Sequence, residues 1–475
     1  MFRTSVVPLV LLCSAPLVSN AGETPNHALA RLDVVATDIK GAPVTDLSAA
    51  DIQVKEDGKS RPVVFFRLAG RSGPSGVAGT GAFQNHPADP VTIILLDRWN
   101  ERLMTSATAI HELGKALAGM QSVERVYVYF LSNKSLTEGQ LLPVRPLPDP
   151  DTGFRILDST NPAELVRRLD EGEKSIVDLR HERNLEPGDR ATITAKAIDI
   201  LSRAAATLPG PKNLIWITHG FPVRFSNGDR VVDVTPGVQK TAESAARSRI
   251  AIYAVYQSSE GAAGDNMDLI RLTLEDFADF TGGRWYTSDR VGAAIDGALA
   301  DARGLYRLAY TPVSGGVPST LRVDAVRKGV KLLVRPNPAD ADTAQTAEDA
   351  FNAEAHSPFD ATDVALRVDV SRNPGGIIHF DIRVDPRDLF LEPRPGGFHA
   401  SFAVAFAFYR NRVLQAFPPP VKKELILTEE QFHAASKDGI LISHDVLMRD
   451  PVDQARVMVY DPGVEGLGSV TIALK

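Results

Sequence analysis

Four nearly continuous apolar runs constrain the fold of this chain more than any other feature. The runs are Val91–Leu96, Val126–Leu131, Leu214–Ile217 and Ile250–Tyr256. Strands that are apolar on both faces are typical of a parallel sheet covered by helices on both sides. Between the runs, apolar residues recur at helical spacing, as at Leu103, Ala107, Ile110, Leu113 and Leu117 and at Ile193, Ala197, Ile200, Ala204 and Leu208. The order predicts an α/β domain with a doubly wound, mostly parallel sheet over residues 91–311.

The segments on either side of this domain have a different pattern, in which apolar and polar residues alternate. Residues 27–69 are predicted to form a small β module, with Asp57-Gly58 as the turn of a hairpin between Ile52–Val54 and Val63–Phe66. Residues 358–475 contain strictly alternating runs such as Ile378–Val384, so an antiparallel β-sandwich is predicted there.

Two seams separate these parts. Residues 70–90 are rich in Gly, Pro and small polar residues and are expected to be a linker, and residues 337–357 are expected to be a second linker with a short helix. Strands predicted within residues 312–336 are expected to pack with the N-terminal module, because neither segment can bury its apolar face alone.

Residues 1–21 have the layout of a secretory signal peptide. Arg3 supplies a positive start, an apolar run extends from Ser5 to Val18, and small residues around Ala21 offer a cleavage site. This segment holds Cys13, the single cysteine, so the mature chain is predicted to have no disulfide and no thiolate metal site. The chain is therefore expected to be exported, to the periplasm or outside the cell, with no transmembrane segment after signal removal. A net charge of −7 also excludes a general attraction to nucleic acid.

Several motifs of the central domain resemble a von Willebrand factor type A domain. In Leu95–Asn100 a buried strand delivers Asp97 into the following loop, like the opening of that fold. Thr192–Ile198 resembles its second metal loop, and Asn213–Gly220 resembles its fourth strand. Phe280–Tyr286 resembles the Thr-Gly-Gly turn before its last strand. The motifs occur in the order of that fold.

The resemblance extends beyond the central domain. Leu32–Phe66, Leu305–Pro312 and Gly329–Lys331 are similar to a bacterial family of exported von Willebrand A-related proteins. This family is known by its sequence pattern more than by an activity. The resemblance implies an α/β domain of the von Willebrand A kind, flanked by β structure.

The resemblance also implies a candidate metal site. Binding A domains often hold a divalent ion through Asp-x-Ser-x-Ser, a threonine from a second loop and an aspartate from a third. Asp97 matches the first carboxylate, Thr192 matches the threonine, and Asn100 and Glu101 offer replacement oxygens for Mg²⁺ or Ca²⁺. The two serine positions and the third-loop aspartate position depart from the pattern and hold Trp99, Glu101 and His219. The alternative is that Asp97 and Asn100 cap the following helix without a metal.

Residues around the same loops are predicted to contact a protein partner. They are Arg98, Trp99, Glu101, Thr194, Thr218, His219 and Phe221. Exposed tryptophan and arginine are enriched at binding hot spots, whereas the alternative for Trp99 is burial in the domain core.

These patterns favour an exported, non-enzymatic interaction protein of an adhesion or scaffold kind. No catalytic residue and no cofactor-binding residue is predicted. Two alternatives stay open: a hydrolase or other enzyme whose site has no sequence signature, and a purely structural component of the cell envelope. A deep pocket with converging carboxylates and histidines would favour an enzyme, and a shallow loop face would favour a binding module.

Overall fold

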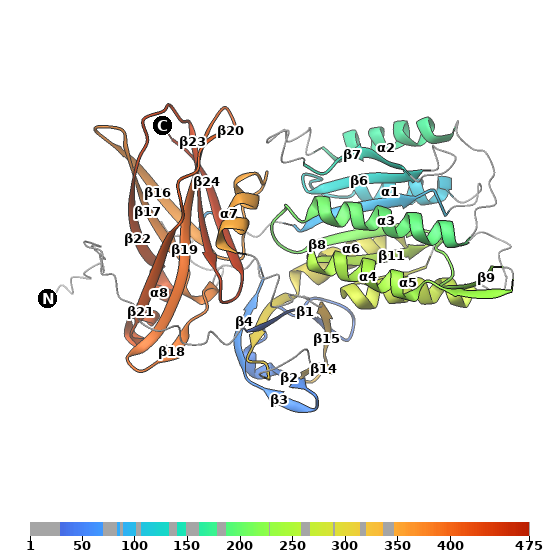
Figure 1. Cartoon of the computed structure of the whole chain (residues 1–475), viewed down its shortest axis with the longest axis horizontal. Helices are drawn as coiled ribbons and strands as arrows, with labels where there is room; N and C mark the ends of the chain where they lie inside the picture. The colour runs from blue at the N-terminus through green and yellow to red at the C-terminus, as the bar shows by residue number, and fades with distance from the viewer. Residues whose placement is uncertain are drawn as a thin grey trace.

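The computed structural model describes most of the chain as three connected parts (Figure 1). The described residues are 29–69, 83–85, 89–100, 106–132, 140–148, 161–177, 187–227, 229–257, 267–287, 290–313, 320–335 and 346–474. The predicted signal peptide, Glu101 and much of both predicted linkers lie outside these ranges. Within them, no helix is long and apolar enough to cross a membrane.

The middle domain is built on a six-stranded mixed sheet with the strand order β12-β11-β8-β5-β6-β7. The strands are β5 (Val91–Asp97), β6 (Val126–Ser132), β7 (Gln140–Arg145), β8 (Lys212–Thr218), β11 (Ile250–Tyr256) and β12 (Arg284–Tyr286). Neighbouring strands from β12 to β6 are parallel, whereas β7 pairs antiparallel with β6. The four apolar runs thus become the four central strands. The sheet is thus mostly parallel, with one antiparallel edge strand, and a short connection suffices for such a pair.

Helices cover both faces of this sheet. One face packs against α1 (Ser106–Ala118), α2 (Pro162–Val177) and α6 (Val291–Arg303). The other face packs against α3 (Pro187–Ala205), α4 (Thr235–Arg247) and α5 (Met267–Thr281). A hairpin of β9 (Arg224–Asn227) and β10 (Arg230–Asp233) projects beyond β8.

The N-terminal module combines strands from both ends of the middle domain. One sheet has the order β15-β1-β13-β4, from β1 (Ala30–Asp38), β4 (Val63–Leu68), β13 (Leu305–Tyr310) and β15 (Val330–Arg335). A second sheet has the order β14-β2-β3, from β2 (Ile52–Glu56), β3 (Lys59–Arg61) and β14 (Leu321–Ala325). Their apolar faces share one core, formed by Leu32, Val34, Ile52, Val54, Leu308 and Tyr310.

The hairpin expected in this module is shorter than the sequence suggested. Asp57 and Gly58 have φ values of 47° and 78° and join β2 to β3. Val63–Phe66 belongs instead to β4, which pairs with β13. Pro62 separates β3 from β4, and a proline supplies no N–H to continue the ladder.

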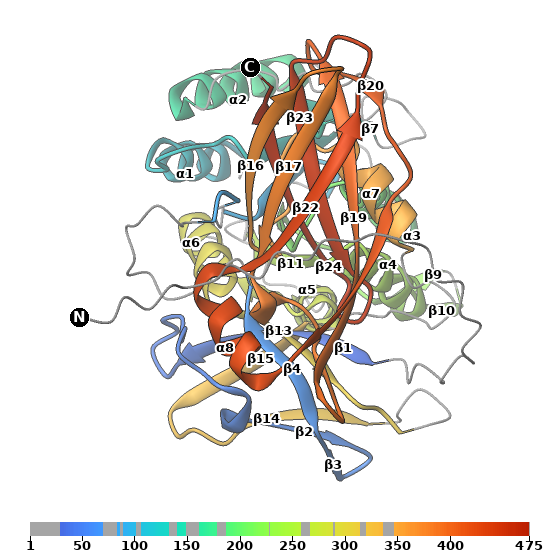
Figure 2. The same ribbon diagram turned by 90° about the vertical axis from the view of Figure 1, so that its left-hand side faces the viewer.

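The C-terminal part is an antiparallel β-sandwich, which faces the viewer in Figure 2. One sheet has the order β16-β17-β22, from β16 (Leu366–Asn373), β17 (Ile377–Val384) and β22 (Ile440–Leu447). The other contains β18 (Glu392–Arg394), β19 (Gly397–Arg410), β20 (Val413–Ala416), β21 (Val421–Leu427), β23 (Gln454–Asp461) and β24 (Gly466–Ala473). The core between the sheets includes Phe380, Phe402, Phe406 and Phe408. Helix α8 (Glu429–Asp438) connects β21 to β22, and α7 (Ala347–Ala355) packs on the outer face of β19 and β23.

The sandwich lies against the amino ends of the central strands. Lys212 begins β8 and Arg249 precedes β11, and both line a cavity of about 290 Å³ together with Glu354 and Tyr460 of the sandwich. The loops at the carboxyl ends of β5, β8 and β11 therefore lie at the opposite end of the middle domain, away from the sandwich (Figure 1).

Candidate functional site: the loop face of the middle domain

The parallel pairing of β5, β8 and β11 brings the ends of these strands together. Leu96 is in register with Ile217, and Thr218 with Tyr256. Asp97 therefore lies beside Thr218 at the edge of the sheet where open α/β sheets bind their ligands. We call the loops at this edge, together with the β9–β10 hairpin, the loop face.

Asp97 is buried, with 2% of its surface exposed, and hydrogen-bond donors surround its carboxylate. The backbone N–H of Asn100 donates to Oδ1 at 3.1 Å. Oδ2 accepts from three side chains: Asn100 Nδ2 at 2.6 Å, Thr218 Oγ1 at 2.7 Å and Trp216 Nε1 at 3.1 Å. Burial raises the pKa of Asp97, and these donors oppose that rise.

Asn100 connects the first loop to helix α3. Its Nδ2 also donates to Thr194 Oγ1 at 2.7 Å, and both residues are fully buried. Thr192, the residue matched to the second metal loop, is exposed, and its hydroxyl donates to the Gly188 carbonyl at 2.8 Å. Positions two apart on a helix point to different sides, so only one of the two threonines can reach Asn100. The structure places Thr194 there.

The turn after β8 positions Thr218 and His219. Thr218 Oγ1 accepts from the Gly220 N–H at 2.8 Å while it donates to Asp97. Gly220 has a φ of 67°, and a Cβ on it would lie 2.7 Å from Ile270 Cγ2, so this turn requires glycine. His219 is 8% exposed, and its ring meets the Tyr256 ring edge to face at a centroid distance of 6.5 Å.

Asp97, the first carboxylate of the predicted metal site, has its oxygens engaged by protein donors. Mg²⁺ and Ca²⁺ need oxygen lone pairs directed at one point, whereas Asp97 directs its lone pairs at four protein donors. The side-chain nitrogen of Asn100 lies between Asp97 and Thr194, where it donates to both. Among the described residues, His, Cys, Asp and Glu form no group of three that could hold a metal ion. Glu101 lies outside the described residues.

Most side chains that were predicted to contact a partner lie beneath the loop surface. Trp99 is 4% exposed and Phe221 is 1% exposed, and both belong to the core that packs the sheet against α3, α4 and α5. The Trp216 ring lies 6.3 Å from the Phe221 ring, between centroids. The alternative of core burial therefore describes Trp99. Thr194 and Thr218 are also buried.

Arg98 is fixed to a neighbouring helix. Its Nη2 lies 2.7 Å from Oε1 of Glu173 on α2, and the two side chains are 10% and 17% exposed. The pair ties the first loop to α2.

The described residues that do project from the loop face lie on the β9–β10 hairpin, which the sequence analysis did not single out. Val231 is 75% exposed, and Arg224 Nε pairs with Asp233 Oδ2 at 2.9 Å across the hairpin. The signal in the sequence is Gly228-Asp229 between Asn227 and Arg230, since Gly-Asp between two strand-like segments is typical of a two-residue hairpin turn.

The described part of the loop face has no deep pocket at Asp97. The hollow lined by Asp97, Arg98, Thr218 and His219 has a volume of about 10 Å³. A hollow of this size holds about one water molecule. The part of the loop face that the structure describes is therefore shallow around the residues of the candidate site.

Comparisons with known proteins assign no family to this chain. No protein-family model matches the sequence, and no curated protein matches it. Among solved structures, the pilus adhesin SpaC from Lactobacillus rhamnosus GG in its open conformation aligns with a TM-score of 0.30 and 9% identity, over 91% of this chain and 57% of the adhesin chain. A point mutant of the PilB minor pilin from Streptococcus sanguinis aligns with a TM-score of 0.25 and 10% identity, over 49% of this chain and 62% of the pilin chain. This chain therefore spans less than two thirds of either protein, and at these TM-scores the likeness supports no conclusion about fold or function.

Proposed function

We propose that this chain is an exported, non-enzymatic interaction protein whose middle domain is of the von Willebrand A kind and binds a protein partner through its loop face. The sandwich is a spacer or a second binding module. The export signal proposed for residues 1–21 places the protein in the periplasm or outside the cell.

The proposal rests on one observation: the described part of the loop face is shallow and lies at the uncovered end of the middle domain. The face lies at the end of the middle domain that is not covered by the sandwich. Its described surface offers a projecting hairpin with the exposed apolar side chain of Val231, and a hollow of only about 10 Å³ beside Asp97. A shallow, partly apolar face fits a protein surface better than a small substrate.

We further propose that binding through this face is independent of metal. The amide of Asn100 bridges Asp97 and Thr194, so the ring of loops is held by hydrogen bonds where a cation would otherwise join them. A partner would then be recognised by shape and by the hairpin, and no acidic group of the partner is needed to complete a coordination sphere.

Site-specific photo-crosslinking in the cells that export the protein tests this proposal. A photoreactive residue at Val231 should give a discrete adduct with one protein, and the adduct should form equally when EDTA is present. The matched control is the same residue at Leu447, which is 56% exposed on the sandwich. Adducts from position 447 alone, or an adduct at 231 that EDTA abolishes, would contradict the proposal.

A further inference from the structure

Two residues of the first predicted linker pair with the edge of the sandwich. Strand β16 has β17 on one side only, so its other side is open to a further strand. The Gln84 N–H donates to the Leu366 carbonyl at 2.7 Å. The Gln84 side chain donates to the Val368 carbonyl at 3.2 Å and accepts from the Val368 N–H at 2.9 Å. Gln84 thus bonds to the open edge of β16 through one backbone and two side-chain hydrogen bonds.

The side chain of Asn85 continues this pairing. Its Oδ1 accepts from the Leu366 N–H at 2.7 Å, and its Nδ2 donates to the carbonyls of Val364 at 2.7 Å and Ala361 at 2.9 Å. Asn85 is 4% exposed, so these bonds are shielded from water. We call Gln84 and Asn85 the linker clasp.

Ion pairs form the second set of contacts between the sandwich and the rest of the molecule, which we call the body. In each of these pairs the arginine comes from the body and the carboxylate from the sandwich. The pairs are Arg31–Glu465 (2.5 Å), Arg67–Asp388 (2.6 Å), Arg67–Asp385 (3.4 Å), Arg249–Asp363 (3.4 Å) and Arg307–Asp363 (3.8 Å). The docking surface of the sandwich is therefore acidic, and the surface that receives it is basic.

Among the described residues, Phe359 and Val464 of the sandwich make apolar contacts across the same boundary. Phe359 reaches the core of the middle domain and lies under the Arg125 guanidinium at 4.2 Å from the ring centroid. Val464 contacts Phe65 and Ala309 of the N-terminal module. The cavity of about 290 Å³ also lies at this boundary and is open to solvent. A polar boundary with such a cavity resembles a transient interface between domains more than a shared core.

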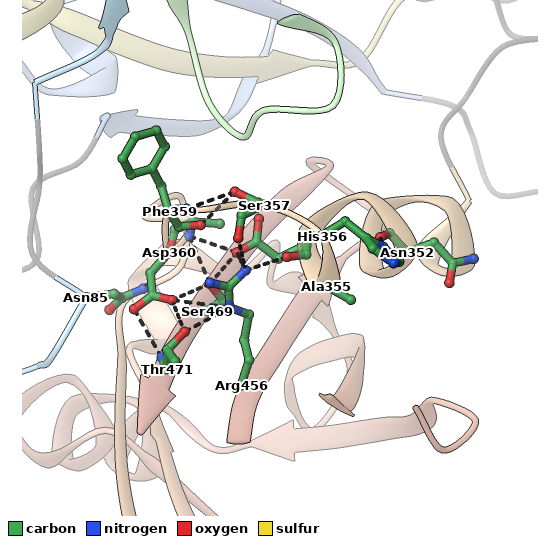
Figure 3. A network of polar contacts seen from close by, with 12 residues as sticks. Asn85, Asn352, Ala355, His356, Ser357, Phe359, Asp360, Arg456, Ser469 and Thr471 are labelled. Carbon is green, nitrogen blue, oxygen red and sulfur yellow. Dashed lines mark hydrogen bonds and ion pairs between the residues drawn. The ribbon is translucent and has the colours of Figure 1, made fainter. Parts of the chain in front are cut away.

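The segment Ser357–Asp363, which leads from α7 to β16, belongs firmly to the sandwich (Figure 3). Arg456 on β23 donates to the Ser357 carbonyl at 2.8 Å and to Thr471 Oγ1 at 2.8 Å. Thr471 Oγ1 in turn donates to Asp360 Oδ1 at 2.6 Å. Arg456 is 3% exposed, so it holds this segment from a buried position within the sandwich. The contacts of this segment with the body are therefore weaker than its contacts with the sandwich.

We propose that the sandwich is a reversibly docked module, held on the body by the linker clasp and by the arginine–carboxylate pairs, and that it separates as a folded unit when these contacts are lost. The angle and distance between the sandwich and the loop face are then adjustable. This inference concerns the chain alone and stands whether or not the loop face binds a partner.

The clasp is tested first by amide hydrogen exchange in the full chain carrying Gln84→Ala and Asn85→Ala. The N–H groups of Leu366 and Val368 lose their acceptors, so they should exchange about tenfold faster. Gln415→Ala is the control, because that exposed side chain bonds only to the nearby Val413 and Leu414 carbonyls. Unchanged exchange at Leu366 and Val368 would show that the clasp does not hold the edge of β16.

Docking itself is tested by the distance between spin labels on the two parts. Cysteines replace the exposed Ile200 on α3 and Leu447 on β22, in a chain with Cys13→Ser. The distribution of distances between the two labels should be narrow in the otherwise unchanged chain. The distribution should broaden when the clasp substitutions are combined with Asp363→Asn, because Arg249 and Arg307 then lose their shared carboxylate.

The matched control for charge is Asp369→Asn, whose carboxylate pairs with Arg367 within the sandwich. This control should leave the distribution narrow. Circular dichroism of the combined variant should show a folded sandwich. A distribution that stays narrow in the combined variant, or a sandwich that unfolds when the clasp is removed, would overturn the proposal.

Discussion

At the scale of single residues, the loop face depends on buried polar and aromatic side chains that hold the loops together. Asp97 accepts four hydrogen bonds, and the cost of removing it follows from the donors left without an acceptor. Trp99 supports the loops by packing under them.

Replacing Asp97 with alanine should lower the free energy of unfolding by about 3 kcal/mol, because buried donors of Asn100, Trp216 and Thr218 lose their acceptor. Chemical denaturation measures this change. Asp296→Ala, at an exposed position on α6, is the control and should change it by no more than about 0.5 kcal/mol. Equal stabilities of the two variants would show that the Asp97 network does not stabilise the fold.

Replacing Trp99 with alanine should destabilise the middle domain by about 3–5 kcal/mol, because a large core side chain is lost. Trp99→Phe should cost less, about 1.5 kcal/mol, since it keeps an aromatic ring and the indole Nε1 has no hydrogen-bond partner among the described residues. Denaturant midpoints of both variants provide the measurement. If the Trp99→Ala variant were as stable as the unchanged chain, Trp99 would not be a core residue, and the prediction that it contacts a partner would stand again.

At the scale of elements, the sandwich carries two neighbouring histidines, His379 and His444, whose surroundings shift their pKa values in opposite directions. His379 on β17 bonds to Asp445 on β22 through Nδ1 at 2.6 Å, and its Nε2 lies 3.3 Å from Asp381. The bond to Asp445 is the main reason that the pKa of His379 is raised above 6.5. His444 stacks on Phe406 at a centroid distance of 5.0 Å, and burial lowers its pKa below 6.5.

In an NMR titration, His379 should therefore take up its proton at a higher pH than His444. Because the folded-state pKa of His379 is raised, its contribution to stability is fully present below pH 6.5 and is lost as the pH rises through the folded-state value. The contribution of His444 has the opposite sign. Because its folded-state pKa is lowered, the unfolded chain takes up the proton first, and stability decreases as the pH falls through 6.5. Asp445→Asn should lower the pKa of His379. The reverse order of titration would contradict the cross-strand bond.

The elements also show what the sequence could predict. Ile250–Tyr256 coincides with β11, and Val91–Leu96 falls within β5, because strands buried on both faces carry an uninterrupted apolar signal. The edge strand β7 carries no such signal: it is half exposed and contains Pro143. Gly228-Asp229 is the sequence signal for the hairpin β9–β10, which was not among the predicted strands.

The candidate site was predictable only in part. The position of Asp97 at a strand end follows from the apolar run before it. The choice of Thr194 over Thr192 depends on the phase of α3 relative to the sheet, and only packing determines that phase. The burial of Phe221 likewise depends on how the turn at Gly220 directs the chain back onto α5.

At the scale of the whole molecule, the three parts are arranged so that the loop face stays uncovered. The middle domain presents the loop face at one end, and the N-terminal module and the sandwich close its other end through ion pairs and the linker clasp. The N-terminal module is assembled from segments before and after the middle domain. The residue pattern of either segment alone does not predict this pairing.

The central claim is that the loop face is organised by hydrogen bonds and works without a metal ion. Calorimetric titration of the chain from Gly22 onward with Mg²⁺, Ca²⁺ and Mn²⁺, accompanied by thermal melts, tests it most directly, with Asp97→Ala and the conservative Asp97→Asn as controls. The account predicts no saturable heat and no change in Tm with any of the three ions. Saturable binding that disappears in the two Asp97 variants would contradict it, and would restore Asp97 as a metal ligand.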